Sequence, residues 1–290
     1  MKRYFKFKMI ALIIVILLLG TIGNIWISSN WLTVHFYECK TSKLSAEQEL
    51  KIVILSDLHG HEFGEDNEKL IKKVKEQQPD LLLLLGDMLN DTSEDAVSVC
   101  ELVSDLGNVA PVYYALGNHE IGFMEQHMTL VEEIEQAGAT VLDEAYVDLD
   151  VNGEEVRLGG MYTYAFGLNA NNDAEAAPED VKDFLEEYQD TDRFKIMMAH
   201  RPDSFIFGDA AAVWDVDLVV SGHDHGGQVV VPFAGGLYGG DQGWFPEYIH
   251  GMYEKDGLQL FVTSGLGSHK QLLPRFNNPP EIAVIICSGN

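Results

Sequence analysis

The stretch K-I-V-I-L-S-D-L-H-G at residues 51–60 decides the fold of this chain. Its first half is a continuous apolar run of strand length, and polar residues follow where that run ends. The same pattern returns in D-L-L-L-L-L-G-D at 80–87 and in P-V-Y-Y-A-L-G-N-H-E at 111–120. Helical spacing between these runs, at 68–77 and 93–106, predicts alternating strands and helices and therefore a parallel sheet that is buried on both faces.

Strands with hairpin turns replace this alternation in the second half of the chain. A third helix, near 124–137, separates the two halves. Asn152-Gly153 and Asp256-Gly257 are two-residue turn signals between apolar runs, and each predicts a β-hairpin. Between the hairpins we expect a polar loop at 169–180, a helix near 181–188, and strands that end at Ala199 and Ser221.

These elements predict an α/β protein in which two mixed β-sheets pack face to face with helices outside, a four-layer αββα sandwich. We expect an N-terminal transmembrane anchor or signal-anchor before this sandwich. We place the boundaries at 1–30 for the membrane helix, 31–50 for a connector with a first strand at 32–37, and 51–290 for the main domain.

The N-terminus combines a basic flank with a long apolar run. K-R-Y-F-K-F-K occupies 2–8, and the run from Met9 to Ile27 contains few polar residues. It approaches the ~20 apolar residues that cross a bilayer, although a secretory signal has a similar flank and an apolar region of ~7–15 residues. No A-x-A cleavage site follows, while Ser28-Ser29 leaves cleavage open, and we favour an uncleaved single-pass anchor in the cell membrane. Because basic flanks stay on the cytoplasmic side, we expect the rest of the chain on the extracytoplasmic side.

Acidic residues dominate the charge of the chain. There are 19 Lys and Arg against 46 Asp and Glu, which gives a net charge of −27 at pH 7. Because nucleic-acid binding requires basic residues that neutralise phosphates, we expect no nucleic-acid partner. The cysteines, Cys39, Cys100 and Cys287, are too few for a disulfide framework and lack the C-x-x-C spacing of a zinc site, so we expect no chemistry from them.

Side chains that can bind metals follow almost every apolar run. Strand carboxyl ends are where α/β sheets place their binding residues, so we expect these side chains to converge. Imidazole, carboxylate and amide groups together suit iron, manganese or zinc. The set is Asp57, His59, Asp87, Asn118, His119, His200, His223 and His225.

The order and context of these residues resemble the calcineurin-like metallophosphoesterases. The contexts are L-S-D-L-H-G, L-L-G-D, L-G-N-H-E, M-M-A-H-R-P and S-G-H-D-H-G-G. The resemblance implies a metallophosphoesterase sandwich that holds two metal ions, Mn, Fe or Zn, about 3.5–4 Å apart. The ligands that it implies are Asp57, His59 and His225 for one ion, Asn118, His200 and His223 for the other, and Asp87 as the bridge.

We expect His119 to act on the substrate instead of holding a metal. Next to Asn118 and followed by Glu120, it fits a general acid or a contact to the phosphoryl group. A neighbouring carboxylate that accepts a hydrogen bond from its other ring nitrogen fixes its tautomer, and Glu120 is the candidate. The implied reaction is attack of a metal-bound hydroxide on phosphorus, after which His119 protonates the leaving oxygen.

The remaining histidines and cations have less specific contexts. His61 follows Gly60 and could reach the rim of the site. Arg275 could bind a phosphate with two hydrogen bonds or form a structural pair with Glu281. Surface or core positions are expected for His35, His127 and His269.

A glycine-rich segment at 232–251 carries several aromatic side chains, among them Phe233, Tyr238, Trp244 and Phe245. One interpretation is a loop that flanks the substrate. The other is a packed loop whose aromatic rings complete the core. The sequence supports the two equally.

The C-terminal motifs resemble one bacterial branch of the family. G-H-D-H-G-G-Q-V-V-V-P-F at 222–233, F-P-E-Y-I-H-G-M-Y at 245–253 and P-R-F-N-N-P-P-E-I at 274–282 are similar to membrane-associated phosphoesterases of the UDP-diacylglucosamine hydrolase type. The resemblance implies an enzyme that hydrolyses a phosphodiester or pyrophosphate bond in a small-molecule or lipid-linked substrate. Two other hypotheses stay open: a catalytically inactive metal-binding receptor or scaffold, and a metallohydrolase that acts on a bond other than a phosphoester.

Overall fold

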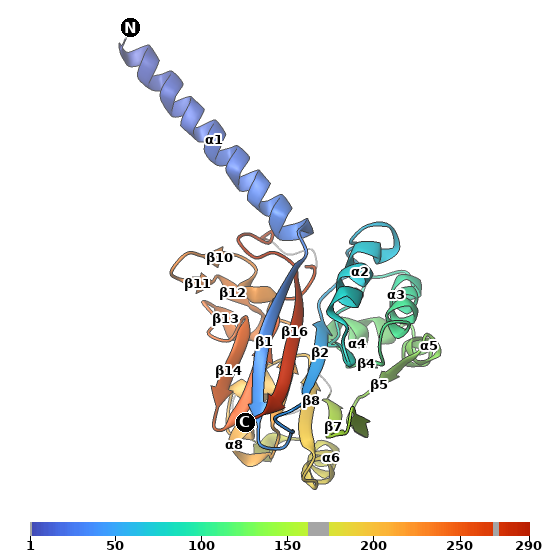
Figure 1. Ribbon diagram of the computed structural model, residues 1–290. Coiled ribbons are helices and arrows are strands. Elements are labelled where there is room, and N and C mark those ends of the chain that lie inside the picture. The colour runs from blue at the N-terminus through green and yellow to red at the C-terminus, as the bar shows by residue number, and fades with distance from the viewer. Residues whose placement is uncertain (1, 162–173, 269–272) are drawn as a thin grey trace.

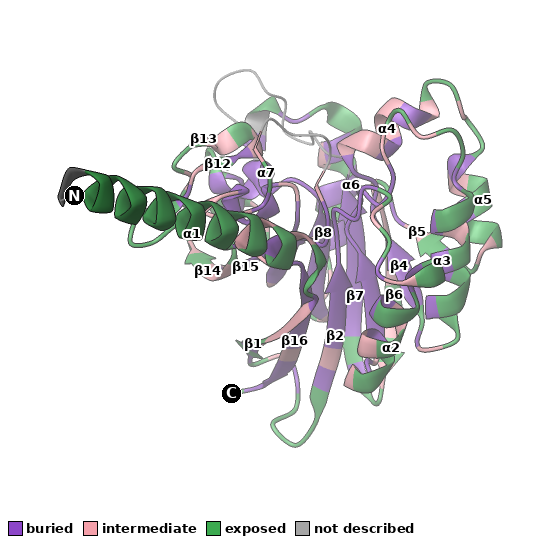
Figure 2. Cartoon of the chain, turned by 90° about the horizontal axis from the view of Figure 1, so that it is seen from above, coloured by how far each residue is buried: buried purple, intermediate pink, exposed green. Residues whose placement is uncertain are grey.

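Apolar strands in two stacked sheets form the centre of the protein. The computed structural model describes residues 2–161, 174–268 and 273–290, and these residues contain two six-stranded sheets (Figure 1, Figure 2). The first sheet has the order β1 (Thr33–Thr41), β16 (Glu281–Gly289), β2 (Glu49–Leu55), β3 (Leu81–Leu84), β4 (Val112–Tyr114) and β5 (Ala139–Val141). The second has the order β14 (Gly251–Lys255), β15 (Leu258–Val262), β9 (Leu218–Ser221), β8 (Phe194–Ala199), β7 (Glu154–Met161) and β6 (Ala145–Val151).

Both sheets are mixed, as the sequence predicts. Strands β2, β3, β4 and β5 pair in parallel, and β16 joins them antiparallel to β2. In the second sheet β7, β8, β9 and β15 are parallel, and the outer strands β6 and β14 are antiparallel partners. The predicted hairpins are confirmed, because the Asn152-Gly153 turn joins β6 to β7 and the Asp256-Gly257 turn joins β14 to β15.

Alternating side chains of each strand build two different cores. In β2, Ile52 and Ile54 face the second sheet, where they share a core with Phe261. Their neighbours Val53 and Leu55 face the helices on the outside of the first sheet. Since successive side chains of a strand point to opposite faces, a continuous apolar run is what a strand needs when both of its faces are covered.

Helices cover the outer faces and complete four layers. The first sheet is covered by α2 (Glu68–Gln77), α3 (Val97–Gly107), α4 (Asn118–Met124) and α5 (Leu130–Gln136). The second is covered by α6 (Glu179–Gln189), α7 (Asp203–Ile206) and α8 (Ala210–Val213). Shorter elements are the strands β10 (Val230–Val231), β11 (Gly235–Gly236), β12 (Tyr238–Gly239) and β13 (Gly243–Trp244), and the 3₁₀ turns η1 (Glu65–Asn67), η2 (Ala174–Ala176), η3 (His225–Gly227) and η4 (Gly240–Gln242).

Three local expectations differ from the structure. The helix expected at 124–137 is shorter, because α4 ends at Met124 and α5 covers only Leu130–Gln136, after Thr129, whose hydroxyl donates to Glu133. Helix α3 starts four residues later than expected, since Ser93 forms a turn with Asn90. Strand β1 extends to Thr41 and pairs along its whole length with β16, so the 31–50 connector contributes an edge strand to the first sheet.

Helix α1 (Lys2–Asn30) projects from the domain, and most of its side chains are exposed (Figure 1, Figure 2). Its segment Tyr4–Asn30 is long and apolar enough, by length and composition, to cross a membrane. The end of the helix is attached to the domain. The side-chain amide of Asn24 donates to Asn277 Oδ1 at 2.7 Å, and the backbone N–H of Asn277 donates to Asn24 Oδ1 at 2.8 Å.

We predict that Phe261→Ala lowers the free energy of unfolding by about 3–5 kcal/mol, because it opens a cavity between the two sheets. Phe261 is fully buried there, with its ring 4.7 Å from that of Tyr37. Denaturant unfolding of the full chain in a neutral detergent measures the change. Phe36→Ala is the matched control, because Phe36 is exposed, and a loss no larger than that of the control would contradict the packing described above.

Candidate metal centre

Five strand ends meet at one edge of the two sheets. Strands β2, β3 and β4 of the first sheet and β8 and β9 of the second are each followed within five residues by a predicted site residue. The residues that follow them are Asp57 and His59, Asp87, Asn118 and His119, His200, and His223 and His225. The structure therefore brings together side chains that are up to 168 positions apart in the sequence, because parallel strands present their carboxyl ends on one side.

The first cluster consists of Asp57, His59 and His225, and their ligand atoms lie within 4.8 Å of one another. The Nε2 atoms of the two histidines are 3.3 Å apart, and His225 Nε2 is 3.8 Å from Asp57 Oδ1. All three residues are buried. Two imidazoles and a carboxylate in this arrangement can hold one metal ion.

The second cluster consists of Asp87, His200 and His223 within the same 4.8 Å limit. His200 Nε2 lies 3.3 Å from Asp87 Oδ2, and that same oxygen lies 3.8 Å from His59 Nε2 of the first cluster. Asp87 therefore stands between the clusters, where a carboxylate can contact two ions.

Asn118 lines the same small cavity as Asp87 and His223 of the second cluster. Its side-chain Oδ1 is buried and has no hydrogen-bond partner among the described residues. It lines a cavity of about 120 Å³ together with Asp87, His119, His223 and Tyr238. A buried polar atom without a partner is costly in a finished site, so this oxygen fits a metal ion that completes the site.

Positive backbone φ angles direct these side chains. Asp57, His59, Asp87, His223 and His225 all have φ between 47° and 69°. Residues other than glycine rarely adopt this left-handed conformation, which is typical of functional sites. The bends at His223 and His225 send their side chains to different clusters, whereas a straight strand would point both to one face.

Hydrogen bonds from the outer ring nitrogens orient the histidines. His200 Nδ1 lies 2.6 Å from the carbonyl oxygen of Leu85, and His225 Nδ1 lies 3.2 Å from that of Gly267. When Nδ1 carries the proton that it donates, Nε2 keeps its lone pair for the cavity. This is the common orientation of histidines that bind metals.

Burial and charge set the protonation of the site. Burial, with a contribution from His225, lowers the pKa of His59 to about 3, and burial also lowers the pKa of His223 to about 4. His200 differs: burial opposes its charge, but Asp87 outweighs that effect and raises the pKa of His200 to about 9. Although burial opposes it, neighbouring histidines hold the pKa of Asp57 below its usual value. Neutral His59 and His223 and the ionised Asp57 match the protonation state that divalent ions require, whereas His200 has to release a proton when an ion binds.

Glu120 occupies a different position from the one expected. Its buried carboxylate accepts hydrogen bonds from the backbone N–H groups of Asp87, Met88 and Gly117 at 2.7–2.9 Å, and from the Tyr114 hydroxyl at 2.7 Å. These bonds join the turn after β3 to the start of α4. The expectation that Glu120 orients His119 is therefore wrong, and Glu120 instead fixes the backbone that carries Asp87.

Asp91 is the carboxylate beside His119. Its Oδ1 and its backbone nitrogen each lie 3.2 Å from His119 Nδ1. His119 Nε2 is 3.9 Å from Asp87 Oδ2. Sequence reasoning missed Asp91 because it stands in a loop, four positions after Asp87, without a motif of its own.

Asp241 is a second residue that the sequence did not reveal. It lies in η4, 3.2 Å from His223 Nε2, and it pairs with Arg201. No pattern in the sequence connects residue 241 with residue 223, because a loop fold brings them together.

The other histidine and cation candidates are not members of the two clusters, although Arg275 donates to the Gly267 carbonyl that His225 also contacts. His61 packs edge-on against Phe63, His127 stacks on Phe123, and His35 contacts Glu281 at 2.9 Å. The Arg275 guanidinium is buried and donates to backbone carbonyls, including Ser264 and Gly267, so neither suggested role of Arg275 matches its contacts. His269 and the first residues of the 169–180 loop lie outside the described residues.

The aromatic segment at 232–251 divides between the two interpretations. Tyr238 lines the cavity and packs edge-to-face against Trp244, with ring centres 5.4 Å apart. Trp244 and Phe245 are exposed. Tyr248, by contrast, packs against the core outside the second sheet. The middle of the segment therefore lies beside the site, and its end supports the core.

The sequence of this chain is similar to those of known proteins. A model of the calcineurin-like phosphoesterase family matches residues 50–227. The uncharacterized metallophosphoesterase YkuE of Bacillus subtilis is 30% identical over 81% of this chain and 77% of its own length. Phosphodiesterase YaeI of Escherichia coli is 29% identical over 81% of each chain. A metallophosphoesterase of Campylobacter jejuni is 29% identical over 84% of this chain, which spans 60% of that longer relative.

We predict that Glu120→Ala destabilises the protein and lowers its metal content, although Glu120 contacts no metal ligand atom. Each buried donor that loses its acceptor costs about 1–3 kcal/mol, and the substitution leaves several such donors around Asp87. Thermal unfolding and elemental analysis measure the two effects. Glu125→Ala, an exposed residue next to the same helix, is the control, and wild-type behaviour of both variants would refute the role assigned to Glu120.

Proposed function

Since this chain belongs to the calcineurin-like phosphoesterase family, and is a metal-dependent phosphoesterase, we propose that it is a membrane-anchored phosphodiesterase with two metal ions. The observation that carries the proposal is the position of Asp87 between the two clusters, with one oxygen facing His59 and His200. One carboxylate oriented toward two sets of ligands is the arrangement that a bridging ligand needs.

The proposed ligands are the residues named from the sequence. Asp57, His59 and His225 would hold one ion and Asn118, His200 and His223 the other, with Asp87 as the bridge. Their nitrogen and oxygen atoms suit manganese, iron or zinc. Bound there, the ions would activate a water molecule and neutralise phosphoryl oxygens.

His119 is the proposed general acid. Its side chain lines the cavity, so it can reach an oxygen of a bound phosphoester. Its backbone N–H donates to Asp87 Oδ1 at 2.8 Å, which ties the position of this residue to the proposed bridge. Asp91 contacts the opposite ring nitrogen and would keep Nε2 turned toward the substrate.

A diester is favoured over a monoester by the charge of the cavity. No lysine or arginine lines it within the part of the chain that the structure describes. A monoester dianion carries one more negative charge than a diester and would need such a cation. The rings of Tyr238 and Trp244 lie where a second ester substituent could pack. The similarity to phosphodiesterase YaeI supports the same choice.

Helix α1 is the proposed membrane anchor. Its length and apolar composition support a single span, and the basic residues Lys2, Arg3, Lys6 and Lys8 support a cytoplasmic N-terminus. The domain with the metal centre would then lie on the extracytoplasmic side. Small-molecule and lipid-linked phosphodiesters are both accessible substrates in that place.

The function is tested with bis(4-nitrophenyl) phosphate and 4-nitrophenyl phosphate as a matched diester and monoester. We expect the full chain, loaded with manganese, zinc or iron, to hydrolyse the diester faster. Asp87→Asn should lower metal content and abolish turnover, because it removes the carboxylate that both clusters share. Two bound metals without hydrolysis of either ester would favour a receptor or scaffold.

We predict that His119→Ala keeps its metal and lowers the rate of diester hydrolysis by about 10²–10⁴, the usual contribution of a general acid. Metal content is measured beside the rate to separate ligation from proton transfer. His127→Ala is the matched control, because His127 stacks on Phe123 away from the cavity. Loss of metal in the His119 variant would show that His119 is a ligand.

A further inference from the structure

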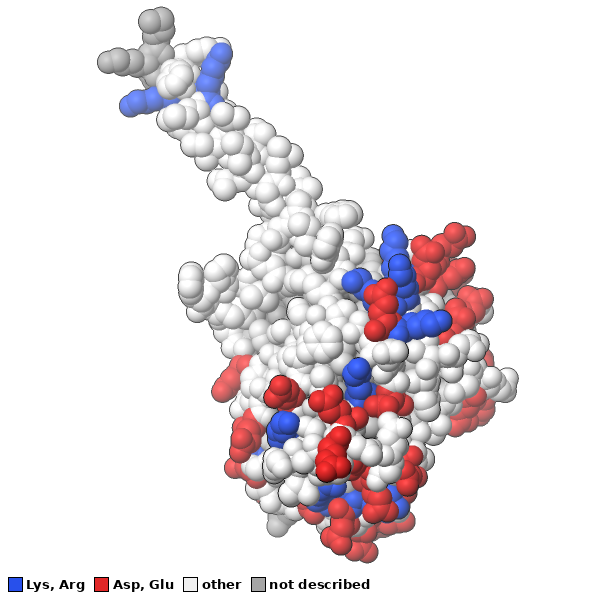
Figure 3. Space-filling view, viewed as in Figure 1, with Lys and Arg blue, Asp and Glu red and all other residues white. Residues whose placement is uncertain are grey.

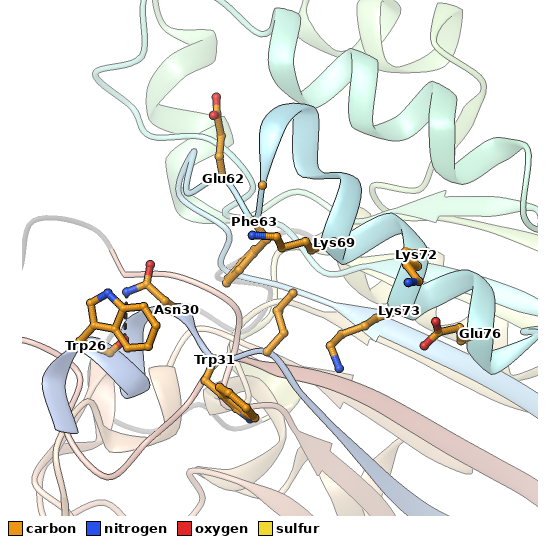
Figure 4. A pocket seen from close by; sticks show the side chains of 11 residues that line it. Trp26, Asn30, Trp31, Glu62, Phe63, Lys69, Lys72, Lys73 and Glu76 are labelled. Atoms are coloured by element: carbon orange, nitrogen blue, oxygen red, sulfur yellow. Dashed lines mark hydrogen bonds between the residues drawn. The ribbon is translucent and has the colours of Figure 1, made fainter. Parts of the chain in front are cut away.

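A second and larger cavity lies where the α1 helix meets the domain. It has a volume of about 610 Å³ and is bordered on one side by Trp26 and Trp31, and on the other by helix α2 (Figure 4). Phe63 lies between the two sides. Among the described residues, this cavity shares no lining residue with the candidate metal centre.

Three lysines of α2 face this cavity. Lys69, Lys72 and Lys73 have the i, i+3, i+4 spacing that places side chains on one face of a helix. Within the described ranges, no carboxylate lies within ion-pair distance of their ammonium groups, and no hydrogen-bond acceptor is assigned to those groups. Glu62 and Glu76 also border the cavity, so its lining has a small positive excess in a chain of net charge −27.

The lysines lie on the side of the domain from which α1 projects. Figure 3 shows a group of basic side chains near the base of α1, with acidic side chains beside them and over the lower part of that view. The chain passes from α1 to β1 through only two residues, Trp31 and Leu32. Bonds from Asn24 to Asn277 and from the Asn278 backbone to the Ser28 hydroxyl hold the end of α1 against the domain.

The tryptophans fit the boundary between lipid and water. Trp26 and Trp31 are 61% and 62% exposed, at the end of the apolar segment. Tryptophan concentrates at membrane interfaces, where its ring meets both the headgroups and the acyl chains. A lipid phosphate at this depth would lie level with the lysines of α2, because α1 is fixed to the domain.

We propose that this cavity binds the phosphate of an anionic phospholipid headgroup and thereby docks the domain on the membrane surface. The inference rests on the proposed anchoring by α1. Lys69, Lys72 and Lys73 supply charged donors to the phosphate, and the two tryptophans pack against the glycerol and the upper acyl chains. The bound lipid is a docking ligand and not a substrate, since the cavity is separate from the metal centre.

The test measures lipid retained by the full chain in a neutral detergent. The chain is mixed with equal amounts of phosphatidylglycerol and phosphatidylcholine of the same acyl chains, and retained lipid is counted by native mass spectrometry. We expect one phosphatidylglycerol to be retained in preference to phosphatidylcholine. Lys69→Gln with Lys73→Gln should weaken that retention about 25-fold, on the basis of about fivefold for each lysine near a membrane surface.

The control variant carries the same change of charge outside the cavity. Lys75→Gln with Lys182→Gln removes two lysines that do not line it, and it should retain phosphatidylglycerol as the wild type does. Equal retention of both lipids, equal weakening in both double variants, or displacement of the lipid by an equal concentration of inorganic phosphate would each overturn the proposal.

Diester hydrolysis in detergent separates this inference from the proposed function. Both double variants should hydrolyse bis(4-nitrophenyl) phosphate as the wild type does, because neither changes the metal centre. A wild-type chain that hydrolyses the diester but retains both lipids equally would count against the docking site alone. A wild-type chain that prefers phosphatidylglycerol but hydrolyses neither ester would count against the phosphodiesterase alone. Resistance of the chain to extraction from membranes by alkaline carbonate tests the anchor separately.

Discussion

The structure depends on one constraint: charged side chains are buried at the edge where the carboxyl ends of strands from both sheets come together. Asp57 and Asp87 are buried together with His59, His200 and His225. Carboxylates in such a place are stable only with cations or hydrogen bonds around them. The turns after the strands, the left-handed residues and the Glu120 hydrogen bonds all hold these groups in one small volume, which is the environment that a metal ion needs.

Helix α1 and the candidate metal centre are connected through the first sheet. Helix α1 passes into β1 after two residues, and β1 pairs with β16, the neighbour of β2. The loop after β2 contains His59 of the first cluster and, four positions later, Phe63, which lines the cavity between α1 and α2. The cavity at the base of α1 and the candidate metal centre thus lie on one framework, so the orientation of α1 fixes the orientation of the site.

The differences from the sequence prediction share a physical cause. Glu120 stands next to His119 in the sequence, yet in α4 its side chain points inward to the Asp87 turn, and Asp91 from another loop reaches His119. Adjacent residues of a helix face different directions, so sequence proximity was a poor guide to contact there. The helix expected at 124–137 begins only at Leu130, because apolar spacing does not reveal the turn that follows α4.

The sequence by itself determined the two mixed sheets, the hairpins and the identity of the residues that gather at the strand ends. Strand length, continuous apolar runs and turn dipeptides are local properties of the sequence. Polar residues that follow buried parallel strands lie together at the carboxyl edge of the sheet. Only the tertiary structure decided which carboxylate orients His119, that Asp241 lies beside His223, and that lysines of α2 face the tryptophans of α1. These contacts join residues from separate loops and helices, and the packing of whole elements sets their distance.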